Sequence, residues 1–369
     1  MEFGWRQCLG WLSGKRATPL LGIDIGSHSV RILELSRAGS RWRVEHFARR
    51  PLPHGAIRDG SIVHPDQVTE ALTEALRDCG THLRQAALAL PSGMVIRKTL
   101  SVVDGLSDEA LELQVEADAE QSLPFSLEEL SLDFGVIGPS SSEPGHVDVM
   151  LVAARKEKID ERLSVVQAAG LRPLVVDVES QALVAAIRLH LQASQPNGVV
   201  AGTFSPADPA GVSAALANSA PEAPEVCALI QLGRESSQFS IVSSSVVVFE
   251  RELSIGLHKF DQETSRRPDQ AAAATQAFHD VVCQEIKRAL QLYATTADPQ
   301  SIHLLLLAGP SDKLALLPAV IGEQLGLSVQ LANPFSAMER SAAVPAAVLE
   351  ADASACLIAC GLAILSAQP

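Results

Sequence analysis

The feature that most constrains the fold is a pattern of elements that occurs twice along the chain. Each half contains three strand-like runs, then a helical stretch, then a fourth strand-like run. In the first half these elements lie at residues 20–25, 30–36, 42–48, 65–79 and 85–90. In the second half they lie at residues 226–232, 238–243, 246–253, 256–295 and 302–307. The duplication predicts two similar α/β lobes that face one ligand cleft.

A smaller group of elements separates the two patterns. Its strands are expected at 95–102, 130–137 and 147–154, and its helices at 108–122 and 156–169. This order predicts a compact α+β insert. The first of these helices carries its glutamates on one side, which is typical of a solvated face rather than of paired catalytic carboxylates.

The remaining segments frame the second half. A strand at 174–178 and a helix at 181–192 follow the insert. Residues 196–224 are rich in Ala, Pro and Ser without a helical or strand period, which predicts a linker or surface loop. The chain is expected to end with a helix at 312–325, a short strand at 328–331 and a closing helix at 351–366.

Composition excludes several classes of protein. The net charge of -14 argues against nucleic acid as a partner, because binding phosphate backbones normally requires a basic surface. The six cysteines lack the spacing of a zinc site and are expected to be reduced and mostly buried. The longest apolar run, residues 355–365, is far shorter than the roughly 20 residues that cross a bilayer.

Residues 1–16 form an unusual tail. Trp5, Leu9 and Leu12 fall at helical spacing, and Arg6, Lys15 and Arg16 add positive charge. Such an amphipathic tail suits peripheral contact with a membrane surface. The alternative is a short arm, disordered or docked on its own domain, because so short a helix is weak alone. The tail lacks the features of a signal peptide, which predicts a cytoplasmic protein.

The stretch LGIDIGSHSVR, residues 21–31, places a carboxylate and a glycine turn directly after a strand. One interpretation is an ordinary polar turn. The other is a phosphate cradle, in which backbone N–H groups and serine hydroxyls surround the anion while Asp24 holds a hydrated metal ion.

An ordered set of motifs resembles the actin-like ATPase superfamily, and within it the PilM family of type IV pilus assembly proteins, which are related to FtsA. The motifs are LLGIDIGSHSVRILELSR, VEADAEQSLPFSLEELSLDF, LVVDVESQAL, QEIKRALQLY, LLLLAG, NPF and ASACLIACGLA, in this order. The resemblance implies two actin-like (ribonuclease H-like) lobes around a nucleotide cleft, with a small α+β subdomain inserted in the first lobe. The implied boundaries are 17–90 and 172–195 for the first lobe, 91–171 for the insert, 225–347 for the second lobe, and 348–369 for a C-terminal helix that packs on the first lobe.

The resemblance further implies ATP or ADP and Mg²⁺ as ligands. Asp24 and Asp177 would be the catalytic carboxylates and would lie near the metal. The first turn would present donors to the phosphates from Gly26, Ser27, His28 and Ser29. For Asp177 a helix-capping role is the rival interpretation.

The second half departs from the family pattern. The resemblance assigns nucleotide contacts to Gly233, Arg234, Ser236, Gly256, Lys287 and Gly309. Gln231 stands where relatives commonly have an acidic residue, and Pro310 stands in place of the second glycine of a Gly-Gly pair. Arg234 either pairs with phosphate oxygens or is a plain surface residue. Because two positions depart, we expect nucleotide binding with weak or absent hydrolysis.

As partner, the resemblance implies the cytoplasmic N-terminal segment of the inner-membrane protein PilN, bound in a groove beside the insert, together with other platform and motor proteins of the pilus. This places the protein at the cytoplasmic face of the inner membrane. The alternatives are a true ATPase, or a nucleotide-silent interaction module of a pilus or type II secretion platform. No P-loop, Rossmann, H-E-x-x-H or G-x-S-x-G motif is present, so those chemistries lack support.

Overall fold

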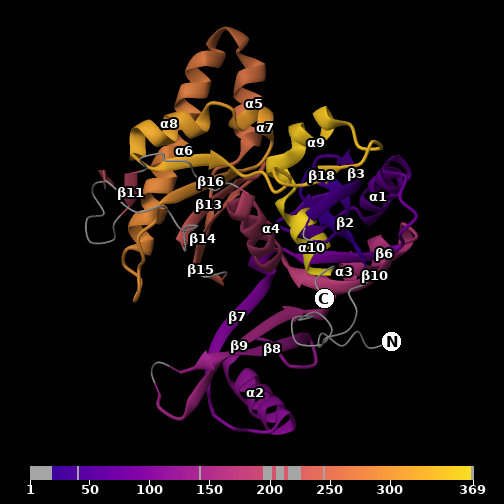
Figure 1. Cartoon of the computed structure of the whole chain (residues 1–369), viewed down its shortest axis with the longest axis vertical. Helices are drawn as coiled ribbons and strands as arrows, with labels where there is room; N and C mark the ends of the chain where they lie inside the picture. Colours follow the sequence, from indigo (N-terminus) through magenta and orange to yellow (C-terminus); the bar gives the residue numbers. More distant parts are fainter. Residues whose placement is uncertain are drawn as a thin grey trace. The chain divides into compact units, whose positions relative to one another are not determined.

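The computed structural model describes residues 19–39, 41–140, 143–193, 202–204, 212–214, 226–243 and 246–366 (Figure 1). The amphipathic tail expected at residues 1–16 lies outside the described residues. So does most of the interval 196–224, which was expected to be irregular.

The first large sheet has the strand order β10-β6-β1-β2-β3-β18. Its strands are β1 (Leu21–Ile25), β2 (Ser29–Ala38), β3 (Arg41–Pro51), β6 (Gln85–Leu90), β10 (Arg172–Val178) and β18 (Glu339–Arg340). The strands β1, β6 and β10 are parallel. Parallel strands need helical crossovers, and α1 (Pro65–Cys79) and α3 (Lys156–Ala168) supply them.

The second large sheet has the strand order β15-β14-β13-β16-β17. Its strands are β13 (Val226–Leu232), β14 (Ser237–Ser243), β15 (Val246–Leu253), β16 (Leu304–Ala308) and β17 (Ser328–Leu331). The order matches β3-β2-β1-β6-β10 of the first sheet, strand for strand. The duplication predicted from the sequence is therefore confirmed.

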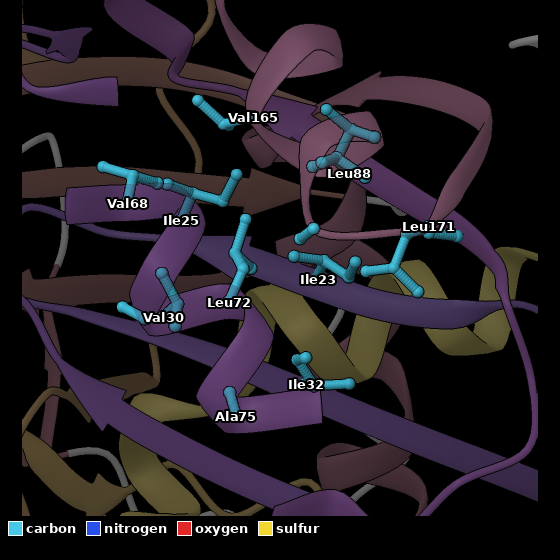
Figure 2. Close-up of a cluster of buried hydrophobic side chains, with 14 of the residues drawn as sticks. Ile23, Ile25, Val30, Ile32, Val68, Leu72, Ala75, Leu88, Val165 and Leu171 are labelled. Carbon is cyan, nitrogen blue, oxygen red and sulfur yellow. The ribbon is translucent and has the colours of Figure 1, made fainter. Parts of the chain in front are cut away.

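The core of the first unit lies between one face of the parallel strands and their helices. Ile23 and Leu88, on neighbouring strands, are completely buried in one cluster with Leu72 of α1, and Figure 2 shows Ile23 beside Leu72. Each such side chain contributes about 1.5–3 kcal/mol. The helix α1 ends at Gly80, whose φ of 68° is the left-handed cap that glycine adopts without strain.

The insert is a three-stranded antiparallel sheet with the order β7-β9-β8. Its strands are β7 (Val95–Val103), β8 (Leu130–Pro139) and β9 (His146–Arg155). The short 3₁₀ helix η2 (Ser92–Met94) precedes β7, and the helix α2 (Asp108–Ser122) lies between β7 and β8 in the sequence. Figure 1 shows α2 against one side of this sheet. Leu100, Leu151 and Val115 form part of the core between them. Ser107 caps α2 by accepting a 3.3 Å bond from the Ala110 N–H.

Further elements connect these sheets along the chain. They are β4 (Ile57–Arg58), β5 (Ser61–Ile62), α4 (Glu179–Ala193), α5 (Leu257–Arg266), η3 (Pro268–Gln270) and α6 (Ala271–Tyr293). The break predicted near Pro268 in the long helical stretch is confirmed.

Two helix predictions were wrong. The helix expected at 312–325 is two helices, α7 (Ser311–Leu314) and α8 (Leu317–Leu325), because Pro318 lacks the N–H that would bond back to Leu314. The closing helix is divided into α9 (Ala346–Asp352), η4 (Ala353–Ala355) and α10 (Leu357–Ser366).

The interval expected to be an irregular loop contains two short paired strands. The strands β11 (Gly202–Phe204) and β12 (Val212–Ala214) pair in antiparallel register. No single described helix is long and apolar enough to cross a membrane. The segments Ala346–Ala355 and Leu357–Leu365 pass that test of length and composition only as a pair bent by 92°.

The chain divides into two compact units. One comprises Met1–Ile32, Ala48–Ser180 and Leu365–Pro369, and the other comprises Leu33–Phe47 and Gln181–Ile364. The two candidate turns fall in different units, so each is described by itself below.

Candidate functional site

The turn between β1 and β2 is a closed two-residue hairpin. The Gly26 N–H donates to the Ser29 carbonyl at 3.1 Å, and the Leu52 N–H donates to the His28 carbonyl at 2.6 Å. Ser27 is exposed, and its hydroxyl lies 3.0 Å from His28 Nδ1. The Gly26 amide is therefore used inside the turn, and the residues at its tip are the exposed Ser27 and the half-buried His28.

Asp24 is buried near the end of β1, and its Oδ2 accepts a 3.0 Å charged hydrogen bond from Arg31 on β2. Burial raises the pKa of Asp24, and the Arg31 guanidinium opposes that rise. The other carboxylate oxygen faces the turn, since a Cβ on Gly26 would lie 3.9 Å from Oδ1. Sequence reasoning missed the role of Arg31, although a hairpin turning at residues 27 and 28 places positions 24 and 31 opposite each other.

A second cation lies close to Asp24. Arg162 of α3 is 1% exposed and donates from Nη2 to the Gly60 carbonyl at 2.8 Å, with Nη1 4.0 Å from Met94 Sδ. Its charge acts with Arg31 to lower the pKa of Asp24 against the larger effect of burial. Burial also lowers the pKa of Arg162 itself. The first unit thus compensates Asp24 with two of its own guanidinium groups.

Asp177 lies at the end of β10, where its Oδ1 accepts a 2.7 Å bond from the Val178 N–H. Burial raises the pKa of Asp177 to about 7, the Val178 bond lowers it, and the nearby charge of Asp133 raises it. The helix α4 begins at Glu179, so Asp177 lies one residue before the capping position. Among the described residues, its side chain bonds only the amide of Val178, which differs from a helix-capping aspartate.

Asp24 and Asp177 lie in one row across three parallel strands. Val176 pairs with Leu88 and Asp177 with Ala89, while Ile23 also pairs with Leu88. Asp24 therefore lies beside Ala89, and the two carboxylates point to the same face of the sheet, about 10 Å apart at Cα, which is two strand spacings. The structure places the two predicted metal ligands in one row and on one face of the first sheet, with a strand between them.

In the second unit, a tight turn follows β13. The Leu257 N–H donates to the Gly233 carbonyl at 3.0 Å, and the His258 N–H donates to the Arg234 carbonyl at 2.9 Å. A Cβ on Gly233 would lie 2.3 Å from the Ser236 oxygen, and one on Gly256 would lie 2.1 Å from the Arg234 oxygen. Only glycine fits at these two positions.

Arg234 is half-buried and donates from Nε to His258 Nδ1 at 3.3 Å, so it is not a freely solvated surface residue. The structure gathers Gly233, Arg234, Ser236 and Gly256 around one turn.

Gly309 joins this group from the neighbouring strand β16. Its φ of 137° is open to glycine alone, and a Cβ there would lie 2.8 Å from the Leu232 oxygen. Its N–H donates to the Ser354 carbonyl at 3.1 Å, and its carbonyl accepts a 2.6 Å bond from the Ser354 hydroxyl. Sequence reasoning missed Ser354. Lys287 lies on the exposed side of α6, and no hydrogen bond or ion pair among the described residues ties it to the turn.

The duplicated fold allows the two turns to be compared position by position. Gln231 pairs with Ala308 on β16. Leu307 of β16 pairs with Leu331 of β17, so the next residues, Ala308 and Ala332, lie side by side. Ala332 therefore belongs to the same row as Gln231 and Ala308. The row Asp24, Ala89 and Asp177 thus corresponds to Gln231, Ala308 and Ala332. Gln238 lies opposite Gln231, where Arg31 lies opposite Asp24. The second unit carries an uncharged version of the first row.

Comparison with known protein families shows which family the chain belongs to. The model of the family described as type IV pilus assembly protein PilM matches residues 22–208 and 269–367, which is more than half of the chain. The chain belongs to this family. The matched segments include Asp24 and Asp177, while the turn at Gly233 to Ser236 lies in the unmatched interval.

One solved structure agrees with the PilM family assignment at the level of the fold, and two others are more distantly similar. A PilM-PilN type IV pilus biogenesis complex superimposes with a TM-score of 0.73 at 23% identity, covering 96% of this chain and 100% of that one. The ethanolamine utilization protein EutJ from Carboxydothermus hydrogenoformans gives 0.48 at 13% identity, covering 97% of each chain. MreB5 of Spiroplasma citri bound to ADP gives 0.45 at 9% identity, covering 94% of this chain and 95% of that one. The chain has an actin-like fold, as the resemblance implied.

Proposed function

We propose that this protein is an actin-like scaffold of type IV pilus assembly, which binds nucleotide and the cytoplasmic N-terminal segment of PilN and couples the two. The observation that carries the nucleotide part is the row of Asp24 and Asp177 beside the Gly26–Ser29 turn. Membership of the PilM family and the fold of the PilM-PilN complex support the partner.

The first unit fits ATP or ADP with Mg²⁺. The exposed Ser27 and the half-buried His28 at the tip offer donors to phosphate, and Arg31 adds positive charge close to the turn. Asp24 and Asp177 offer the carboxylate oxygens that Mg²⁺ prefers, and water molecules would complete its octahedral shell across a gap of this size. When bound, the ion would neutralise phosphate charge. The chain's own residues would orient the nucleotide around it.

The second unit is proposed to contribute contacts of its own through the residues assigned from the family motifs. They are Gly233, Arg234, Ser236, Gly256, Gly309 and Lys287. The glycines allow a close approach of backbone to ligand, because none of Gly233, Gly256 and Gly309 has space for a side chain. Arg234 would meet phosphate oxygens, for which its guanidinium is suited.

Hydrolysis is proposed to be weak or absent. The row of Gln231, Ala308 and Ala332 supplies no carboxylate, and Pro310 removes a backbone donor beside Gly309. Phosphoryl transfer needs charge stabilisation as well as positioning, whereas binding needs less. A true ATPase is the second candidate, because the first unit retains both Asp24 and Asp177 as possible catalytic groups.

The third candidate is a nucleotide-silent module of a pilus or type II secretion platform. The pairing of Asp24 with Arg31 favours it, since a carboxylate already compensated by a guanidinium attracts a metal ion less strongly. This candidate keeps the PilN contact and loses the coupling.

We propose that residues 91–171 are the inserted subdomain beside which the PilN segment binds. The sheet face opposite α2 is exposed at Val103 (54%), and Ile137 at the end of β8 is 56% exposed. An extended segment laid along this face would gain apolar contacts, and main-chain bonds at a sheet edge would add to them. The other domain boundaries given above stay predictions, as do further platform and motor partners.

We further propose that the protein works at the cytoplasmic face of the inner membrane, where the PilN segment would be available. Contact of the tail at residues 1–16 with the membrane surface is part of the same proposal. No nucleic acid partner is proposed, because the net charge of -14 opposes one.

Fluorescence titration with a labelled ATP analogue and Mg²⁺ tests the nucleotide part. Ser27→Glu places a carboxylate at the exposed tip of the turn and should weaken binding about tenfold or more, because a like charge near phosphate costs more than about 1.4 kcal/mol. Ser126→Glu, at another exposed serine of the same unit, is the matched control and should leave affinity unchanged. Absence of saturable binding to the wild type would overturn the nucleotide part.

A further inference from the structure

One row of residues across the insert sheet lies next to the segment where β10 meets α4, which contains the proposed ligand residue Asp177. On β9, Val152 pairs with Arg97 of β7 on one side and with Asp133 of β8 on the other. The three side chains therefore share the sheet face opposite α2, because the residues that pack on α2, such as Leu100 and Leu151, occupy the alternate positions. Arg97 and Asp133 carry opposite charges at the two ends of this row.

Both charged residues act on the corner between β10 and α4, residues 177–180. Arg97 donates from Nη1 to the Ser180 hydroxyl at 3.0 Å, and Ser180 is only 2% exposed. Asp133 is 7% exposed, and its charge is close enough to raise the pKa of Asp177. Among the described residues, the insert thus acts on the corner through an attractive hydrogen bond from Arg97 to Ser180 and through electrostatic repulsion between Asp133 and Asp177.

The same corner holds one end of the Asp24–Asp177 row. We propose that Arg97 and Asp133 are positioning residues that couple the ligand state of that row to the orientation of the insert sheet. The proposal rests on the proposed function and names the residues that connect its two ligands. Neither residue is assigned contact with the nucleotide.

The coupling follows from charge balance. Asp177 would hold a divalent cation through its carboxylate, and the cation would supply positive charge there. The repulsion that Asp133 exerts on Asp177 would then be weaker, so residues 177–180 would lie closer to the insert sheet. The hydrogen bond from Arg97 to Ser180 would keep residues 177–180 attached to the insert sheet during this change. By linkage, a peptide on the insert sheet that favours the settled arrangement must increase affinity for Mg-nucleotide by the same factor.

The test measures this factor directly. The affinity of a labelled peptide copying the PilN N-terminus is measured with and without saturating Mg-ATP, and the affinity for Mg-ATP is measured with and without the peptide. In the wild type the two ratios should agree, and couplings of this kind are typically about 5-fold or more. In Ser180→Ala and Arg97→Met both ratios should fall toward one, while Arg97→Lys should restore part of the effect.

Ser180→Ala is the decisive variant, because Ser180 is buried and lies off the exposed sheet face, so each ligand should still bind alone. Lys98→Met is the matched control, since Lys98 is exposed and points to the opposite face of the same strand. A loss of folding would lower both affinities, whereas the proposal predicts a loss of the ratio with the single affinities retained. If the wild type shows the ratio and Ser180→Ala keeps it, only this inference is overturned. If the wild type binds neither ligand, the proposed function and this inference both fall.

Discussion

Asp24 and Asp177 belong to different strands, yet they lie in one row of the first sheet with only Ala89 between them. The duplicated sheet repeats this row with Gln231, Ala308 and Ala332 in the same places. One copy of the fold has two carboxylates in that row, and the other has none. This asymmetry is the physical basis for expecting binding without efficient turnover.

The asymmetry predicts a gain of function. Gln231→Asp would place a carboxylate in the second row, beside Ala308, where Mg²⁺ could find an additional oxygen ligand. We expect nucleotide binding to become more dependent on Mg²⁺ and phosphate release to rise above the wild-type level. Gln238→Asp, on the neighbouring strand outside the three-residue row, is the matched control. An increase with the control and none with Gln231→Asp would contradict this interpretation of the row.

The stability of the protein should depend on pH through Asp177. Its pKa is about 7 in the folded state against 3.8 as the ordinary value, so the folded state holds the proton more tightly. The contribution of Asp177 to the free energy of unfolding is then fully present below about pH 4. It falls as the pH rises toward 7, by at most about 1.4 kcal/mol per pH unit.

Urea unfolding between pH 4 and 8 tests this. The difference between wild type and Asp177→Asn should change with pH in that window, since Asn does not titrate. Asp133→Asn should move the upper end of the window to lower pH, because it removes a nearby negative charge. A difference curve that is flat across the window would refute the raised pKa.

The ion pair in the first unit should be costly to break. Asp24→Ala leaves the Arg31 guanidinium, only 12% exposed, without its carboxylate, and we expect a loss of about 3–5 kcal/mol of unfolding free energy. The exposed pair of Arg41 and Glu339, at 3.3 Å, is the control, and Glu339→Ala should cost less than about 1 kcal/mol. Equal losses in the two variants, measured by urea unfolding, would show that burial does not set the strength of the pair.

Close packing of α10 against α4 depends on a glycine. A Cβ on Gly361 would lie 1.8 Å from the Ala182 carbonyl oxygen, so Gly361→Ala must push the two helices apart. We expect a loss of about 1–3 kcal/mol. Gly93→Ala adds the same methyl group where nothing lies within 4 Å and should be nearly neutral. Thermal unfolding of both variants checks this, and a neutral Gly361→Ala would be incompatible with the packing described here.

Local patterns predicted those features that depend on local chemistry. The helical period predicted both ends of α1, at Pro65 and Cys79, and glycine with polar neighbours marked the turn at Gly26. Arg31 was also within reach of sequence reasoning, because hairpin register alone places it opposite Asp24.

Other features had no local signal. Arg162 bonds the carbonyl of Gly60, 102 residues away, and Asp133 approaches Asp177 only after the insert has folded. The division between α7 and α8 was missed because apolar periodicity outweighed Pro318 in the prediction, whereas the missing N–H decided the structure.

The central claim is that nucleotide and the PilN segment bind to one scaffold and influence each other. Fluorescence anisotropy of a labelled peptide copying the PilN N-terminus, titrated with the full chain with and without Mg-ATP, tests it most directly. The account predicts saturable binding whose affinity shifts when Mg-ATP is added. Saturable binding that ignores ATP would contradict the coupling and leave a nucleotide-silent module, and no binding under either condition would contradict the PilN partner itself.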